Sequence, residues 1–253
     1  MTIDSHAHLG MDAFNDDRDA VIERAKEAGI TGVITIGVTL ADSEKGLDIA
    51  GRYDMVYASV GIHPHEVKDI EPKTYDRLRA LVRRAKVVAI GEIGLDFYYN
   101  HSPKDLQFRH FADQLDLAVE LDLPVIIHDR EAHVETLEFL GYRKGRLRGV
   151  LHCFSGDLKM AKKCVDLGFA ISIAGPITYK KSEPLQEVAV KMPLETLLIE
   201  TDAPYLAPQP WRGERNEPAY VIETARRVAE VRGITAKEVE VATEINARRL
   251  FGL

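Results

Sequence analysis

The feature that most limits the possible folds is a repeated unit: a short run rich in Val, Ile and Leu, a turn, and an amphipathic helical pattern. Nearly continuous apolar runs are typical of strands in a parallel sheet covered by helices. The unit occurs eight times, which favours a closed (β/α)8 TIM barrel over a doubly wound open sheet. The predicted strands are 3–6, 32–36, 55–60, 87–90, 124–128, 149–152, 169–173 and 196–200. The predicted helices are 17–28, 41–51, 72–85, 103–121, 131–140, 158–167, 183–191, 218–232 and 236–250.

The length of 253 residues suits one such barrel, and no interdomain linker or low-complexity tract divides residues 1–253. With 45% hydrophobic and 29% charged residues, the composition is that of a globular protein with a sizeable core. No stretch approaches the roughly 18 apolar residues of a membrane helix, and the N-terminus lacks the form of a signal peptide. Cys153 and Cys164 form no C-x-x-C motif. We therefore expect a cytoplasmic protein with no membrane partner.

The net charge of −7 bears on the choice of partner. A protein that grips nucleic acid through many phosphate contacts is usually basic, so the composition argues mildly against that partner. Bound divalent cations would change the local sign, because an ion is often the largest charge in its site. Net charge alone therefore leaves a nucleic-acid partner open.

Residues that can bind metal follow several predicted strands at the point where each strand ends. His6 and His8 are two apart, and on an extended strand such residues point to the same side. In a barrel the C-terminal ends of the strands carry the active site, so residues distant in sequence converge there. Scattered strand caps are the alternative, but caps would not place so many metal-competent side chains on so many strands. The residues are His6, His8, His63, His65, Glu92, His128, His152 and Asp202.

These strand ends carry short polar blocks, in the order DSHAH at 4–8, GIHPH at 61–65, GEIGLD at 91–96, IHDREA at 127–132, HCFSG at 152–156 and ETDAP at 200–204. RG at 212–213 and RNEP at 215–218 complete the series. Together the blocks resemble the signature blocks of the TatD-type metal-dependent hydrolases, in order and over essentially the whole chain. Members of that family are described as metal-dependent deoxyribonucleases within the amidohydrolase superfamily of barrels, and the resemblance implies the same fold and chemistry here.

The resemblance implies a centre of two divalent cations. A set of nitrogen and oxygen donors suits Zn²⁺, Mn²⁺, Fe²⁺ or Co²⁺, and the resemblance keeps Mg²⁺ as a further candidate. It assigns His6, His8 and Asp202 to one metal and His128 and His152 to the other, with Glu92 shared between them. An anionic bridge suits this arrangement, because two cations about 3.5–4 Å apart repel each other. Four neutral histidines and two carboxylates would leave the site net positive, which suits a phosphodiester substrate.

The same resemblance implies hydrolysis by a metal-activated water. Glu92 and Asp202 are the predicted catalytic residues: Glu92 bridges the metals, and Asp202 can also accept the proton of the water. The leading interpretation is a deoxyribonuclease that binds DNA transiently and acts at its ends, with RNA as a further substrate. One alternative is an ester or amide hydrolase, such as a D-aminoacyl-tRNA deacylase or a small-substrate amidohydrolase. The other is a metal-binding protein without turnover.

A second set of residues is expected on the substrate side of the metals. His63 and His65 are also two apart, and they either contact phosphate, donate to the leaving group, or cap the third strand. Arg130 suits a bidentate phosphate clamp. The alternative for Arg130 is a surface ion pair with Glu131 or Glu135.

Glu200, Arg212 and Asn216 complete the substrate-side set. Glu200 is expected to orient a ligand histidine, and Arg212 and Asn216 to contact substrate from the last loop, with solvent exposure as the alternative. Cys153 directly follows His152, so strand parity predicts that it points away from the metals and into the core. Loop aromatics that either stack on a base or simply pack are Tyr98, Tyr99 and Trp211.

Overall fold

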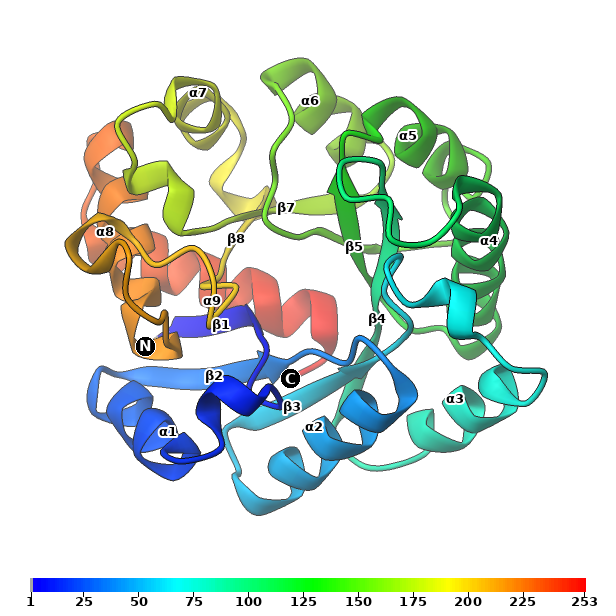
Figure 1. Cartoon of the computed structure of the whole chain (residues 1–253). Helices are drawn as coiled ribbons and strands as arrows, with labels where there is room; N and C mark the ends of the chain where they lie inside the picture. The colour runs from blue at the N-terminus through cyan, green and yellow to red at the C-terminus, as the bar shows by residue number, and fades with distance from the viewer. Residues whose placement is uncertain (1) are drawn as a thin grey trace.

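The computed structural model describes residues 2–253, and its eight strands form one parallel sheet in sequence order (Figure 1). Each strand pairs with the next one along the chain. The strands are β1(Thr2–Ala7), β2(Ile30–Thr35), β3(Val56–Val60), β4(Val87–Asp96), β5(Val125–Arg130), β6(Gly149–Leu151), β7(Phe169–Ile173) and β8(Leu197–Ile199).

The sheet closes on itself between β1 and the chain just beyond β8. Ala7 and Ala203 form a parallel bridge, and the His8 amide donates to the Ala203 carbonyl at 2.7 Å. The Asp202 amide donates to the His6 carbonyl at 2.9 Å. The predicted (β/α)8 barrel is therefore confirmed, and its closure lies among residues expected to bind metal.

Eight helices surround the strands because each presents an apolar stripe to the sheet (Figure 1). In α4, for example, Phe111, Leu115 and Ala118 lie three or four residues apart and are buried. No helix among residues 2–253 is both long and apolar enough to cross a bilayer. The surrounding helices are α1(Arg18–Glu27), α2(Leu40–Arg52), α3(Thr74–Val82), α4(Lys104–Leu121), α5(His133–Gly141), α6(Leu158–Asp166), α7(Glu183–Lys191) and α8(Val221–Arg232).

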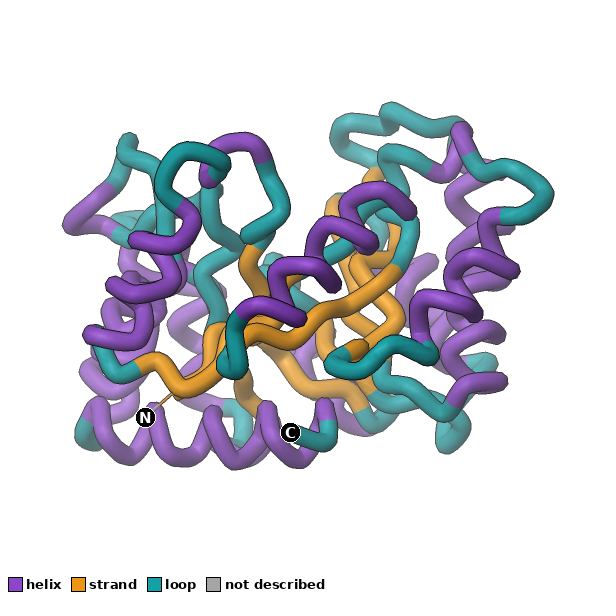
Figure 2. The backbone as a smooth tube through the Cα atoms, turned by 90° about the horizontal axis from the view of Figure 1, so that it is seen from below, coloured by secondary structure: helices purple, strands orange, loops and turns teal. Residues whose placement is uncertain are grey.

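A further helix, α9(Ala236–Phe251), lies across the N-terminal end of the barrel, opposite the loops that follow the strands (Figure 2). It begins with a capping box, in which Thr235 and Glu238 each accept a hydrogen bond from the other's backbone amide. Ala247 and Phe251 of α9 pack against an apolar layer inside the barrel, so a substrate can approach only from the opposite end. The layer consists of Ile3, Ile34, Ile36, Val88, Ala89, Ile126, Val150 and Leu198.

The strand β4 continues to Asp96, although the sequence predicted that it ends at residue 90. Its last residues pair with β5, with Gly94 opposite His128 and Asp96 opposite Arg130. Gly94 permits this approach because a Cβ atom there would lie 1.9 Å from the His128 carbonyl oxygen. Glycines usually weaken a strand, which is why the extension was not predicted. The extension places Glu92 inside the strand rather than in the loop after it.

Candidate metal centre and substrate cleft

Six donor side chains from five strands converge at the open end of the barrel, beside a cavity of about 510 Å³. Five of them are buried, and His128 is half-buried. The strand ends therefore bring together the residues that the sequence assigned to one metal centre. They are His6 in β1, His8 directly after it, Glu92 in β4, His128 in β5, His152 after β6 and Asp202 after β8.

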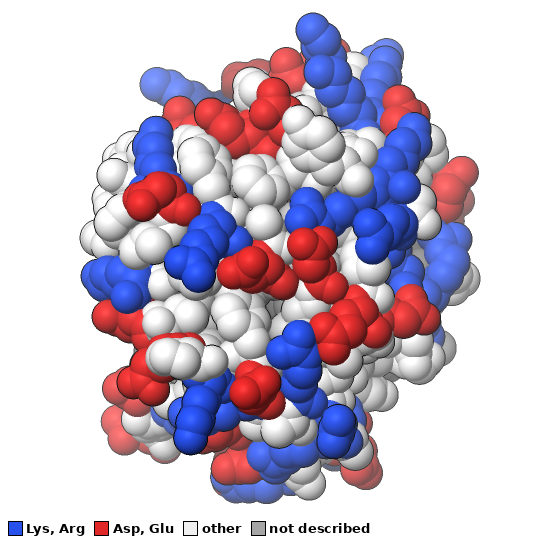
Figure 3. Space-filling model, turned by 90° about the vertical axis from the view of Figure 1, so that its right-hand side faces the viewer, with Lys and Arg blue, Asp and Glu red and all other residues white. Residues whose placement is uncertain are grey.

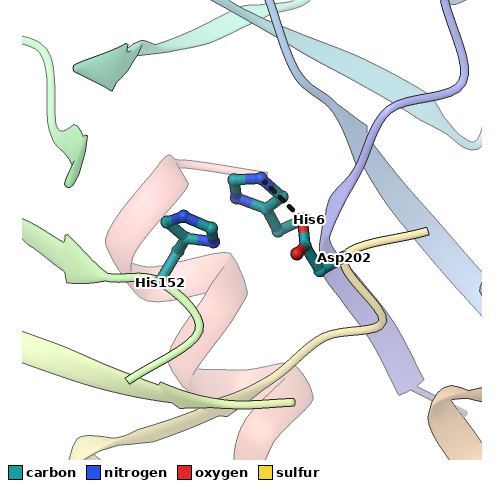
Figure 4. A group of neighbouring side chains, drawn as sticks. All are labelled: His6, His152 and Asp202. Carbon is teal, nitrogen blue, oxygen red and sulfur yellow. Dashed lines mark ion pairs between the residues drawn. The ribbon is translucent and has the colours of Figure 1, made fainter. Parts of the chain in front are cut away.

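The first group of donor atoms comes from β1, β4 and the chain after β8. His6 Nε2 lies 3.3 Å from His8 Nε2 and 3.4 Å from Glu92 Oε2. Asp202 Oδ1 lies 3.6 Å from His6 Nε2 (Figure 4). The same oxygen lies 3.3 Å from His8 Nε2. Ligand atoms about 2.0–2.1 Å from a tetrahedral zinc ion would lie roughly 3.3–3.4 Å apart. These separations fit one small divalent cation.

The second group lies on the other side of Glu92. Glu92 Oε1 is 2.8 Å from His128 Nδ1 and 2.7 Å from His152 Nε2, and these two nitrogens are 3.3 Å apart. Glu92 thus directs Oε2 to the first group and Oε1 to the second. The groups are in contact, since the rings of His6 and His152 stack with their centroids 3.9 Å apart (Figure 4).

The two buried carboxylates have histidines as neighbours and no basic partner. Among residues 2–253, neither Glu92 nor Asp202 forms an ion pair with a Lys or an Arg. Buried carboxylates are normally paired or coordinate a metal. A set of imidazole nitrogens and carboxylate oxygens suits divalent cations such as Zn²⁺ and Mn²⁺, so the donor set fits the implied metals.

The histidines keep both carboxylates ionised. Burial alone would raise the pKa of Glu92, but His152 and His63 hold it well below its ordinary value. Burial likewise opposes ionisation of Asp202, and His8 lowers the pKa of this carboxyl. Both groups are therefore anionic at neutral pH and able to act as ligands.

His63, expected on the substrate side, lies against the metal centre. Its Nε2 is 3.5 Å from Glu92 Oε1, and only 8% of the residue is exposed. With Glu92 and His128 it forms a further group whose donor atoms lie within 4.8 Å of one another. Burial lowers the pKa of His63 to about 4, so its ring is neutral at neutral pH. His63 is thus an additional candidate donor, which the sequence reasoning did not assign to the metals.

Asp96 contacts His128 of the second group on the ring nitrogen that faces away from Glu92. Its Oδ2 lies 3.2 Å from His128 Nε2 and 2.8 Å from His65 Nε2. A carboxylate on the far nitrogen of a ligand histidine fixes the orientation of the ring and frees the near nitrogen for metal. Sequence reasoning gave Asp96 no role. Its signals were its place at the end of the GEIGLD block and four residues after Glu92, a spacing that acquires meaning because β4 continues that far.

Glu200 supports His152 in the same way. Its Oε1 lies 3.2 Å from His152 Nδ1 and accepts a hydrogen bond from the Cys153 amide at 2.6 Å. Glu200 is completely buried and has no surface to offer a substrate. Its position fits the expected orienting role and speaks against direct substrate contact.

Asp4, to which the sequence gave no role, joins β1 to the chain after β8. Its Oδ1 accepts from the Thr201 amide at 2.9 Å and from the His6 amide at 3.3 Å. Its Oδ2 accepts from the Thr201 hydroxyl at 2.6 Å. Burial raises the pKa of Asp4 to about 8. These bonds fix the backbone on either side of the first donor group.

Two residues of the centre adopt the left-handed backbone conformation, Cys153 at φ +41° and Asp202 at φ +58°. Such conformations cost a non-glycine residue about 1–3 kcal/mol and are concentrated at functional sites. The turn at Cys153 also breaks the strand alternation after His152. Cys153 is therefore half-buried and lines the cleft, so the prediction that it points into the core is wrong.

Comparison with known proteins gives this geometry a family. The sequence model of the family described as TatD related DNase matches residues 3–252. The chain belongs to this family. A relative from Bacillus subtilis (strain 168), named "Uncharacterized metal-dependent hydrolase YabD", is 38% identical over 252 residues, which are 99% of both chains. A relative from Citrobacter koseri, named "3'-5' ssDNA/RNA exonuclease TatD", is 39% identical over 256 residues, covering 99% of this chain and 98% of the relative. The crystal structure of YJJV, a TatD homologue from Escherichia coli K12, is 34% identical and superposes with a TM-score of 0.94 over 100% of this chain and 98% of the other.

Membership of the TatD family makes this chain a metal-dependent hydrolase. The clustered donors agree with the use of divalent metal.

In this TatD-family cleft, Arg130 stands exposed at the rim. Among residues 2–253 it forms no ion pair, with Glu131, Glu135 or any other acid. Its guanidinium carbon lies 4.4 Å from the ring centroid of Tyr98 and 5.3 Å from that of Tyr99. Stacking on these rings leaves the N–H groups at the edge of the guanidinium available to an anion.

The last loop, which carries the RG and RNEP blocks, offers fewer candidate substrate contacts than the sequence predicted. Asn216 is fully buried, and its side-chain amide donates to two backbone carbonyls at 2.8 and 2.6 Å. It therefore holds the loop together and is neither exposed nor placed to contact substrate. Arg212 is exposed, with its guanidinium 4.3 Å from the ring centroid of Tyr179. Trp211 packs on Tyr220, with their centroids 4.0 Å apart.

Proposed function

We propose that this chain is a two-metal phosphodiesterase that removes nucleotides from the ends of single-stranded DNA and RNA. The observation that carries the proposal is the Glu92 carboxylate, because its two oxygens face separate groups of donors. His6, His8 and Asp202 would hold one cation and His128 and His152 the other, with Glu92 shared. The mixed nitrogen and oxygen donors suit Zn²⁺ and Mn²⁺, and Mg²⁺ is the third candidate.

Bound divalent cations would supply Lewis-acid activation of a water molecule and neutralise charge on the phosphate. Asp202 is anionic and can take a proton from the attacking water. Arg130 can bind a non-bridging phosphate oxygen, since no acid occupies its guanidinium. Asp96 and Glu200 hold two of the ligand rings in the orientation that metal binding needs.

Support for a nucleic-acid substrate comes from relatives and not from overall charge. TatD-named relatives of Citrobacter koseri and Salmonella typhimurium, each 39% identical to this chain, carry the name 3'-5' ssDNA/RNA exonuclease. On the face built by α3, α4 and α5, Lys and Arg are interspersed with Asp and Glu (Figure 3). With a net charge of −7 as well, attraction to phosphate must come from the metal centre and Arg130. Such a local grip suits transient binding of a strand end.

We also propose a cytoplasmic location, since both cysteines are free thiols and reduced cysteines are usual in that compartment.

The test is a side-by-side assay of metal-loaded enzyme on single-stranded DNA, single-stranded RNA, a D-aminoacyl-tRNA and a dihydropyrimidine. We expect shortening of the single strands from one end. Glu92→Gln, purified in the same way, serves as the control for contaminating nucleases. Turnover of the aminoacyl ester or the cyclic amide alone would replace the phosphodiesterase with the ester or amide hydrolase considered above. Tight metal binding with no turnover of any substrate would favour a binding protein.

A further inference from the structure

The cleft has a second lobe of about 370 Å³ beside the cavity over the metal centre. It is lined by the end of β5 and by the segments that follow β6, β7 and β8, and we call it the β7 lobe. It shares His128, Arg130, His152, Asp202 and Leu206 with that cavity, so it opens directly on the donor groups. Pro184 and Leu185 at the start of α7 also line it. Its volume is at the small end of the range for small-molecule sites, which suits one nucleoside rather than a continuing strand.

We propose that the β7 lobe takes the base and sugar of the 3'-terminal nucleotide while the 5'-phosphate of that nucleotide lies at the metal centre. This inference rests on the proposed function. In the reaction, the oxygen of water bonds to phosphorus, and the bond from phosphorus to the 3'-oxygen of the preceding nucleotide breaks. The leaving 3'-oxygen takes up a proton, and a 5'-mononucleotide is left in the lobe.

Tyr179 gives the lobe a rigid aromatic surface. Its hydroxyl donates to the Ala207 carbonyl at 2.9 Å, and its own carbonyl accepts from the buried Ser182 hydroxyl at 2.8 Å. Arg212, which is not among the residues that line the lobe, stacks on the ring at 4.3 Å. A side chain fixed in this way loses little conformational entropy when a ligand packs on it. Arg212 is thus a positioning residue for Tyr179.

Stacking on Tyr179 suits an enzyme that must accept every terminal base. Base–aromatic stacking tolerates any sequence because each base has a π face. On this proposal, a strand end is recognised by stacking and by the space available, and not by the sequence of its bases.

The opposite side of the cavity is built differently. Tyr98 and Tyr99 are 59% and 54% exposed, and Arg130 stacks on both rings. Tyr99 lines the cavity over the metal centre and is not among the residues that line the β7 lobe, whereas Arg130 lines both. An open aromatic surface can pass a strand of any length. We therefore assign the rest of the strand to this surface and only its last nucleotide to the β7 lobe.

The experiment measures binding of 5'-thymidine monophosphate to the metal-loaded enzyme by calorimetry. Tyr179→Leu should bind it roughly 5- to 150-fold more weakly, the range expected for loss of one stacked base. Tyr179→Phe loses the bond to Ala207 but keeps the ring, and should bind within about twofold of wild type. Tyr142→Leu, at an 83% exposed tyrosine outside the cleft, controls for removal of an aromatic side chain. Wild-type affinity in Tyr179→Leu would overturn the assignment, as would an equal loss in Tyr179→Phe.

Two further measurements test which end of the strand occupies the β7 lobe. Tyr99→Leu should bind the mononucleotide as wild type does but raise KM for a long oligonucleotide. The 3'-monophosphate of thymidine should bind more weakly than the 5'-isomer and show no dependence on Tyr179. Dependence of the 3'-isomer on Tyr179, or of the 5'-isomer on Tyr99, would reverse the placement and refute the proposal. If the wild type degraded no nucleic acid and bound no mononucleotide, both the proposed function and the assignment of the β7 lobe would be wrong. If the wild type degraded single strands but Tyr179→Leu bound the mononucleotide equally well, only the assignment of the lobe would be wrong.

Discussion

The two ends of the barrel interior are built from the same strands but have opposite chemistry. Ile126 and Val150 belong to the apolar layer that packs against α9, and two residues further along the chain stand His128, in β5, and His152, directly after β6. At the end covered by α9, apolar side chains fill the space and exclude water. At the C-terminal ends of the strands, histidine nitrogens converge on two carboxylates that no Lys or Arg of residues 2–253 neutralises.

This contrast separates the residues that stabilise the barrel from those that perform its chemistry. In barrel enzymes the loops and strand ends of the C-terminal face carry catalysis, and the other face carries stability. Changes at the donor end should therefore cost activity with little loss of stability, and changes at the α9 end should do the reverse. The predictions below test that separation, from the largest expected effect on activity to the smallest.

Glu92→Gln should have the largest effect, because it removes the one anion shared by both donor groups. The amide is nearly isosteric, so thermal unfolding should stay close to that of wild type. Turnover should fall by more than the roughly 100-fold that loss of an outer hydrogen-bond partner can cost. Elemental analysis should find fewer than two metals per chain. Full occupancy together with wild-type rates would remove Glu92 from the bridging role.

Asp202→Asn keeps an oxygen that can coordinate metal but cannot take a proton. If Asp202 is the general base, kcat should fall at least about 10²-fold while much of the metal is retained. Added metal should not restore the rate. Recovery of kcat at saturating metal would show that Asp202 is a ligand only, and the base assignment would then be wrong.

Asp96→Asn should have an intermediate effect, since Asp96 acts through His128 and not on the substrate. We expect metal affinity to fall about 10- to 100-fold and turnover to recover as metal is added. Asp105→Asn is a matched control, because Asp105 is exposed in the first turn of α4 and touches no donor. Metal titrations followed by activity provide the measurement. Equal behaviour of the two variants would remove the positioning role from Asp96.

The sequence was sufficient to predict the barrel. The strand ends predicted that eight polar residues converge, and the family resemblance singled out six of them as donors. Apolar runs in regular alternation with helices have few solutions, and parallel strands place their C-terminal ends together. The roles of Asp96 and His63 were not accessible in this way. Both roles depend on β4 continuing past Gly91 and Gly94. That continuation depends on how closely neighbouring strands approach, which a pattern of side chains does not predict.

The wrong predictions have a common physical cause as well. Cys153 was assigned by strand parity, which fails because its own φ is positive and turns the chain. Asn216 was assigned by its place in a loop, although a buried loop must satisfy its own backbone carbonyls, and this amide does so. In both cases the local backbone decided where the side chain lies, through its conformation at Cys153 and through the carbonyls that the Asn216 amide serves, and the sequence specifies neither.

Phe251→Ala tests the opposite end of the barrel and should have the smallest effect on activity. Phe251 is 6% exposed in the last turn of α9 and packs on the apolar layer inside the strands. Its truncation should lower the free energy of unfolding by about 3 kcal/mol, the lower end of the range for buried aromatics, because the end of a helix can relax. Phe251→Leu keeps most of the apolar volume and should lose less. Urea unfolding supplies the stability, and kcat per folded, metal-loaded molecule should equal that of wild type in both variants. A fall in kcat comparable to that of Asp96→Asn would mean that α9 and the apolar layer also position the donors at the other end of the barrel. Stability and activity would then not be separated between the two ends.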